Sequence, residues 1–150
     1  MNAEKATDLI ENHLKGLNLD PTLCRGDESG KWSMRVGDAI VWINVFNSPI
    51  DSDDWFMQVS SPLFKMPEKN TEAICIDLLE LGSNMYTCGM VKRDNWFYIL
   101  SLQPLNELMP STIAFIIDKV AFYRNDFFGK MDFKYAGSWA EETITQEEQG

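Results

Sequence analysis

The sequence has little of what metal sites and many active sites require. Its 150 residues include one histidine, His13, and three widely spaced cysteines, Cys24, Cys75 and Cys88. A zinc site needs several histidine or cysteine ligands at short spacing, and a disulfide framework needs an even number of cysteines. The sequence therefore predicts no metal ligands and three reduced, mostly buried thiols.

Positive charge and long apolar runs are also scarce. Thirteen Lys and Arg residues stand against 23 Asp and Glu residues, which gives a net charge of −10 and a pI near 4.4. A field of that sign repels phosphate backbones and anionic lipids, and no stretch approaches the roughly 18 consecutive apolar residues of a membrane span. We therefore expect neither nucleic acid nor a membrane as partner. Because the first residues lack the pattern of a signal peptide, we expect a cytoplasmic protein.

Catalytic and ligand-binding motifs are missing too. The sequence contains no nucleophile elbow and no glycine-rich phosphate loop. His13 falls on the apolar stripe of the first predicted helix, which favours a structural histidine. The run from Asp51 to Asp54 resembles the start of a calcium loop but lacks its central glycine and its twelfth-position glutamate. We predict no catalytic residues and no cofactor.

Hydrophobic periodicity predicts the order α-β-β-β-α-β-β-α. Three helices are expected: over 3–17, over 69–82 with Gly82 as C-cap, and from an N-cap at Ser111 to about Phe128 or beyond. Five strands are expected over 31–36, 39–46, 55–60, 86–92 and 95–102. Pro62 and Pro67 should end the third strand. Because the strands follow one another through hairpins, we predict an α+β domain with an antiparallel sheet and helices on one face. The domain should cover 1–136, with 137–150 as an acidic flexible tail.

Aromatic residues and methionine are abundant, with five Trp, nine Phe, four Tyr and eight Met. Within 40–46, one alternating set is Ile40, Trp42 and Phe46, and the other is Val41, Ile43 and Val45. Helices on one side cover only one of these sets, so we expect the other to meet a partner. The alternative is that the final helix and the loops bury both. Our candidate partner-binding residues are Trp42, Phe46, Trp55, Met57, Trp96 and Tyr98.

Three segments resemble the YbjN-domain family, whose fold is that of type III secretion chaperones. They are Ser61-Pro62-Leu63-Phe64-Lys65-Met66-Pro67, Leu78-Leu79-Glu80-Leu81-Gly82 and Gln103-Pro104-Leu105-Asn106-Glu107-Leu108. The resemblance covers about residues 55–130 and agrees in element order with the rest of the chain. It implies a small acidic homodimer that binds other polypeptides without catalysis.

These observations favour a non-catalytic protein-binding module, either chaperone-like or regulatory. It would bury apolar side chains of a polypeptide client, or add a client strand to a sheet edge. The acidic surface would keep the dimer soluble and favour basic clients. The second helix, near Ile74 and Leu78, is our candidate for the dimer seam. Two alternatives stay open: a regulatory sensor that holds a small ligand in the aromatic pocket, and an enzyme of unrecognised type that uses His13.

Overall fold

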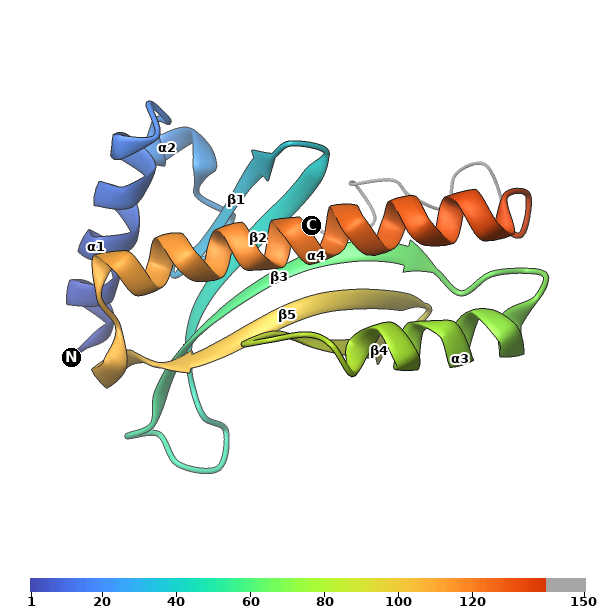
Figure 1. Ribbon diagram of the computed structural model, residues 1–150. Helices are drawn as coiled ribbons and strands as arrows, with labels where there is room; N and C mark the ends of the chain where they lie inside the picture. The colour runs from blue at the N-terminus through green and yellow to red at the C-terminus, as the bar shows by residue number, and fades with distance from the viewer. Residues whose placement is uncertain (140–150) are drawn as a thin grey trace.

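Residues 1–139 of the computed structural model are described here, and they form an antiparallel sheet with helices on one face (Figure 1). Its five strands lie in the order β1-β2-β3-β5-β4. The elements are α1 (Ala3–Gly16), α2 (Pro21–Cys24), β1 (Lys31–Val36), β2 (Ala39–Asn47), β3 (Trp55–Lys65), α3 (Thr71–Gly82), β4 (Gly89–Arg93), β5 (Trp96–Pro104), the 3-10 helix η1 (Leu105–Glu107) and α4 (Pro110–Tyr135). The predicted fold class and the order of the long elements are confirmed; α2 and η1 are short additions.

One face of the sheet, which we call the inner face, is covered by helices. The long helix α4 runs across it and contacts β2, β3 and β5, while α1 packs against α4 and β2 at one end (Figure 1). Helix α3 lies beside α4 at the other end. In the described part of the chain, no helix combines the length and the apolar character needed to cross a bilayer.

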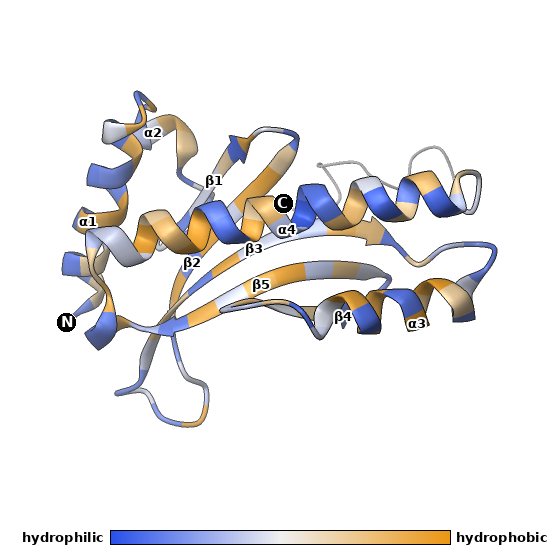
Figure 2. Ribbon diagram, viewed as in Figure 1, coloured by the Kyte–Doolittle hydropathy of each residue, from blue (hydrophilic) through white to orange (hydrophobic). Residues whose placement is uncertain are grey.

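Strand β2 shows why the sheet has two unlike faces. Val41 and Ile43 are at most 1% exposed, because their side chains point into the layer between sheet and helices. Trp42 and Phe46 alternate with them along the strand and are only half-buried on the opposite face, which we call the outer face. Figure 2 shows apolar stretches on β2, β3 and β5 that alternate with paler, more polar ones. Helix α4 contributes a fully apolar stripe to the same core, formed by Ile113, Ile116, Ile117 and Val120.

Strand β3 does not end at Pro62, as the sequence suggested. It continues to Lys65, and Pro62 pairs with Tyr98 of β5. A proline has no N–H for the ladder, and the pairing register shifts between Pro62 and Phe64 to accommodate it. The carbonyl of Pro62 accepts a hydrogen bond from Nε of the buried Arg124 at 3.3 Å, which joins the irregular strand to α4. A proline at a bulge is thus part of a central strand here.

The two later helices begin and end differently from our expectation. Helix α4 starts at Pro110 with Met109 as N-cap, so Ser111 lies inside its first turn. Proline is favoured there because the first helical N–H has no partner within the helix. Helix α3 includes Gly82 and is capped by Ser83, whose N–H bonds to the carbonyl oxygens of the last turn.

The packed domain extends beyond residue 136. The side chain of Ser138 is buried, and its hydroxyl accepts a hydrogen bond from Nδ2 of Asn70 at 3.0 Å. The indole of Trp139 packs 4.7 Å from the ring of Phe64 and donates to the carbonyl of Lys65 at 3.0 Å. Packing contacts therefore continue past residue 136, and the predicted division of the chain into domain and tail stays a prediction. The rest of the predicted tail, 140–150, lies outside the described residues.

Candidate functional site

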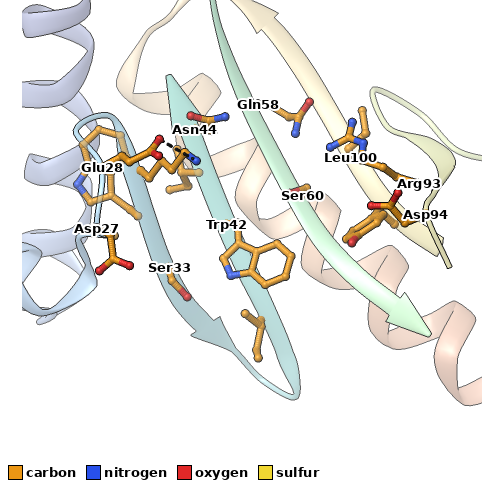
Figure 3. Close-up of a pocket in the computed structure, with 16 residues that line it drawn as sticks. Asp27, Glu28, Ser33, Trp42, Asn44, Gln58, Ser60, Arg93, Asp94 and Leu100 are labelled. Carbon is orange, nitrogen blue, oxygen red and sulfur yellow. Dashed lines mark ion pairs between the residues drawn. The ribbon is translucent and has the colours of Figure 1, made fainter. Parts of the chain in front are cut away.

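The outer face of the sheet carries an open hollow of about 680 Å³. Its floor is a cross-strand row in which Trp42 of β2 pairs with Ser60 of β3, and Ser60 pairs with Leu100 of β5. A second row places Asn44 opposite Gln58. Figure 3 shows Trp42 lying between the positions of Ser33 on β1 and Ser60 on β3. The hollow therefore combines ring and aliphatic surface with side-chain amides and hydroxyls.

Two loops with charged residues form the ends of this hollow. The turn that precedes β1 contributes Asp27 and Glu28, and Glu28 forms an ion pair with Lys31 at 3.2 Å (Figure 3). The β4–β5 turn contributes Arg93 and Asp94 at the other end. The hollow therefore has both signs of charge at its margins.

Gly30 fixes the turn before β1 against the neighbouring strand. Its φ is +82°, and its carbonyl accepts a hydrogen bond from the N–H of Val45 at 2.8 Å. A Cβ at this position would lie 2.8 Å from the carbonyl oxygen of Val45, closer than real Cβ atoms approach. Only glycine fits both the left-handed backbone and this close approach.

A half-buried carboxylate ties the same turn to α1. Glu11 accepts hydrogen bonds from Nε and Nη2 of Arg25, both at 2.7 Å, and from Nε1 of Trp32 at 2.9 Å. These donors lower the pKa of Glu11 from 4.5 to about 2, with Arg25 as the largest cause. We call Glu11, Arg25 and Trp32 the clamp. Because Trp32 is next to Lys31 and lines the hollow, the clamp holds one wall of the candidate site in place.

Aromatic side chains continue along the outer face. The rings of Trp42 and Tyr98 lie 6.4 Å apart at an angle of 49°, and those of Phe46 and Phe56 lie 6.0 Å apart further along the sheet. Burial raises the pKa of Tyr98, so its phenol stays protonated at neutral pH. The rings offer flat apolar surface without a negative charge among them.

The structure brings three of the six candidate partner-binding residues together on the outer face: Trp42, Phe46 and Tyr98. Met57 is fully buried in the core, and Trp55 packs against the core from the same side of β3. Trp96 is 5% exposed, and the ammonium of Lys65 lies over its ring. Strand alternation turns Met57 and Trp55 towards the core, whereas Trp96 lies on the same face of β5 as Tyr98 and Leu100 and is covered there by Lys65.

Helix α3 turns the two residues of the predicted dimer seam inward as well. Ile74 and Leu78 are at most 1% exposed, so neither is accessible to a second subunit. The apolar residues that this helix exposes are Ile76, at 48%, and Leu79, at 76%.

The sequence reading missed the polar residues of the hollow, namely Asn44, Gln58 and Ser60. Asn44 could have been found, because it interrupts the apolar set of β2 at an outer-face position. Ser60 carries no such signal, because nothing in the sequence says that a serine in β3 is 8% exposed.

The remaining reactive side chains are poorly suited to nucleophilic chemistry. Burial raises the pKa of the Cys24 thiol, and it does the same for Cys88, so both are thiols at neutral pH. His13 is half-buried on α1. Among residues 1–139, no group of three or more His, Cys, Asp or Glu side chains is arranged to hold a metal ion.

Comparison with solved structures identifies the fold. A chain of the HopA1–SchA chaperone–effector complex superposes with a TM-score of 0.61 at 11% identity, covering 83% of this chain and 93% of that one. The chain has the fold of a type III secretion chaperone. A second match comes from the Yersinia pestis type III secretion chaperone SycH in complex with a stable fragment of YscM2, with a TM-score of 0.58 and 12% identity over 81% of this chain and 98% of that one.

A third match is a chain of the heterodimeric ExoU–SpcU complex from the type III secretion system of Pseudomonas aeruginosa. Its TM-score is 0.58 at 9% identity, and the match covers 80% of this chain and 95% of that one. No family model matches the sequence, and no curated protein matches it. The chaperone-like fold implied by the sequence resemblance is therefore confirmed, and membership of the YbjN family stays a prediction.

Proposed function

We propose that this chain is a non-catalytic protein-binding module that holds an unfolded segment of a partner polypeptide on the outer face of its sheet. The observation that carries the proposal is the open apolar floor around Trp42 and Leu100, which lies on the side of the sheet opposite to the long helix α4. An exposed apolar surface rimmed by polar groups is typical of a protein-interaction site. The three similar structures are of complexes with effector or partner proteins, which supports the same use of this fold.

The net charge of −10 favours basic partners, because opposite charge speeds the encounter and like charge opposes it. We propose a cytoplasmic role, chaperone-like or regulatory, of the kind that the YbjN resemblance implies. The two charged ends of the hollow would then limit how an incoming segment is oriented across the floor.

A binding experiment with a defined unfolded polypeptide tests the proposal. Reduced and carbamidomethylated lysozyme is basic and unfolded, and its affinity can be measured by calorimetry with the wild-type chain and with Trp42→Ala. Loss of a central aromatic anchor should weaken binding by about tenfold or more. Phe133→Ala is the matched control, because Phe133 is 92% exposed on α4, away from the outer face. Absence of binding to the wild-type chain would refute the proposal, and equal weakening by both variants would refute the location.

We also propose a homodimer that forms through α3. Exposed apolar pairs on a helix are suited to a symmetric contact, and Ile76 and Leu79 form such a pair. Light scattering of the wild-type chain should give about twice the 17.2 kDa of one subunit, and Ile76→Glu with Leu79→Glu should give one subunit. A wild-type mass of one subunit at micromolar concentration would exclude this dimer.

A small-ligand sensor is the second candidate function, because the hollow has the volume of an ordinary ligand pocket. Native mass spectrometry of the purified chain separates the two functions. A retained small molecule that is lost in Trp42→Ala would favour the sensor, whereas lysozyme binding without any retained molecule would favour the protein-binding module.

A further inference from the structure

The outer face contains polar side chains that have no partner in the described part of the chain. Within residues 1–139, the side-chain amides of Asn44 and Gln58 have no hydrogen-bond partner, and neither has the hydroxyl of Ser60. All three line the hollow beside Trp42, and Figure 3 shows Asn44 and Gln58 projecting side by side from β2 and β3. These groups are available to a molecule that enters the hollow.

Ser60 is the most informative of the three. It is 8% exposed, since Trp42 and Leu100 flank it in the cross-strand row. Buried hydroxyls in folded proteins almost always have a hydrogen-bond partner, because an unpaired one costs free energy. The neighbouring Ser61 fits that rule, since its hydroxyl donates to the carbonyl of Ile40 on the adjacent strand. Ser60 instead lines the open hollow, and no residue among 1–139 pairs with its hydroxyl.

The spacing of these groups matches an extended polypeptide. Gln58 and Ser60 are two residues apart on one strand, so their side chains repeat at roughly 6.6 Å. In an extended chain, every second residue directs its N–H and C=O to the same edge, so these groups also repeat at roughly 6.6 Å. If that edge faces β3, the peptide groups and the side chains of Gln58 and Ser60 have matching spacing. Asn44, opposite Gln58, adds a second amide to the row. Each side-chain amide both donates and accepts, as a peptide group does.

We propose that the outer face recognises the main chain of its partner: the amides of Asn44 and Gln58 and the hydroxyl of Ser60 bond to peptide groups of an extended segment laid along β3. Trp42 and Leu100 pack against whatever side chains that segment brings. This inference rests on the proposed function and specifies how the partner is chosen. Peptide groups of helices and sheets are already paired, so this surface selects unfolded segments and tolerates differences in their sequence.

The first test removes the polar groups and keeps the shape of the surface. Affinity for reduced and carbamidomethylated lysozyme is measured for Asn44→Val, Gln58→Met and Ser60→Ala. Each should weaken binding by about fivefold, and the double variant of Asn44 and Gln58 by about twentyfold, because a net hydrogen bond contributes roughly 1 kcal/mol. Asn47→Val is the matched control: the residue is exposed on the same strand but does not line the hollow, and its replacement should leave the affinity unchanged.

The second test uses the wild-type chain and therefore does not depend on how the variants fold. Synthetic 15-residue peptides that tile the lysozyme sequence are compared, and the tightest binder is methylated at one backbone nitrogen at a time. Methylation at alternate positions should weaken binding, because it removes an N–H that the outer face uses, while the positions between should tolerate it.

The outcomes separate this inference from the proposed function. If lysozyme binds and Trp42→Ala weakens it, but neither the amide variants nor any methylation does, side chains alone are recognised and the main-chain inference is wrong. If the amide variants release a small molecule instead of weakening lysozyme binding, the inference is also wrong. If no unfolded polypeptide binds the wild-type chain, the proposed function itself fails.

Discussion

Replacing Glu11 with glutamine tests whether the clamp stabilises the domain through its charge. Glutamine keeps the length and shape of the side chain but removes the negative charge that Arg25 and Trp32 bond to. The Glu11 side chain is 14% exposed, so most of its interactions are shielded from water. We therefore expect a measurable loss of stability without a change of fold.

The size of the loss follows from the pKa of Glu11, which falls from 4.5 to about 2 on folding. At about 1.4 kcal/mol for each factor of ten in proton affinity, the ionised carboxylate contributes at most about 3 kcal/mol. The Arg25 side chain is 53% exposed, so solvent screens its part of the interaction. We expect Glu11→Gln to lower the free energy of unfolding by about 1–2 kcal/mol at pH 7.

The pH dependence gives the sharper test. A carboxyl whose folded pKa is depressed contributes fully above its unfolded pKa, and this contribution is lost as the pH falls through 4.5 towards 2. Urea unfolding followed by circular dichroism should therefore show the difference between wild type and Glu11→Gln shrinking by about half or more between pH 7 and pH 3. Glu107→Gln is the control, because Glu107 is exposed and its side chain has no partner among residues 1–139. A difference that is absent at pH 7, or is as large at pH 3 as at pH 7, would refute this account of the clamp.

Three further predictions concern the core, a turn and the thiols. Leu78→Ala should lower the free energy of unfolding by about 2–5 kcal/mol, because Leu78 is 1% exposed. Leu23→Ala should change it by less than about 0.5 kcal/mol, because Leu23 is 83% exposed. Urea unfolding measures both, and equal effects would contradict the assignment of Leu78 to the core. In the same assay, Gly30→Ala should lower the free energy of unfolding by about 2 kcal/mol or more, because the new Cβ would lie 2.8 Å from the carbonyl oxygen of Val45. An unchanged unfolding midpoint would show that the turn adjusts to the new Cβ without strain. Burial raises the pKa values of Cys24 and Cys88, so both should react slowly with iodoacetamide. At pH 7.5, mass spectrometry should show that alkylation is at least about tenfold slower in the folded chain than in urea. Equal rates would mean that both thiols are open to solvent.

Much of this fold could be predicted from the sequence, because its long elements have clear periodicity. The alternation along 40–46 correctly separates the inner set from the outer set, since strand side chains point to opposite faces in turn. Pro62 could not be placed in the same way. Whether a proline ends a strand or lies at a bulge depends on the pairing of the next strand and on a contact from α4, and neither is a local property.

The candidate site was only partly predictable, for a related reason. An aromatic residue in a strand is compatible with either face, and its type alone does not distinguish them. Trp42 and Met57 are both large apolar strand residues, yet one lies in the hollow and the other in the core. The same holds in a helix: Ile74 and Leu78 are apolar residues on α3 that the core buries, whereas Ile76 and Leu79 on the same helix are exposed. Residue type alone does not separate the two pairs.

The long helix α4 lies on one side of the sheet and the hollow opens on the other, so the core and the hollow are built from different side chains of the same strands. A replacement at a half-buried outer position such as Trp42 changes the lining of the hollow and leaves the layer beneath α4 as it is, whereas a replacement at Val41 or Ile43 does the reverse. The lining of the hollow can therefore be redesigned one residue at a time without repacking the core.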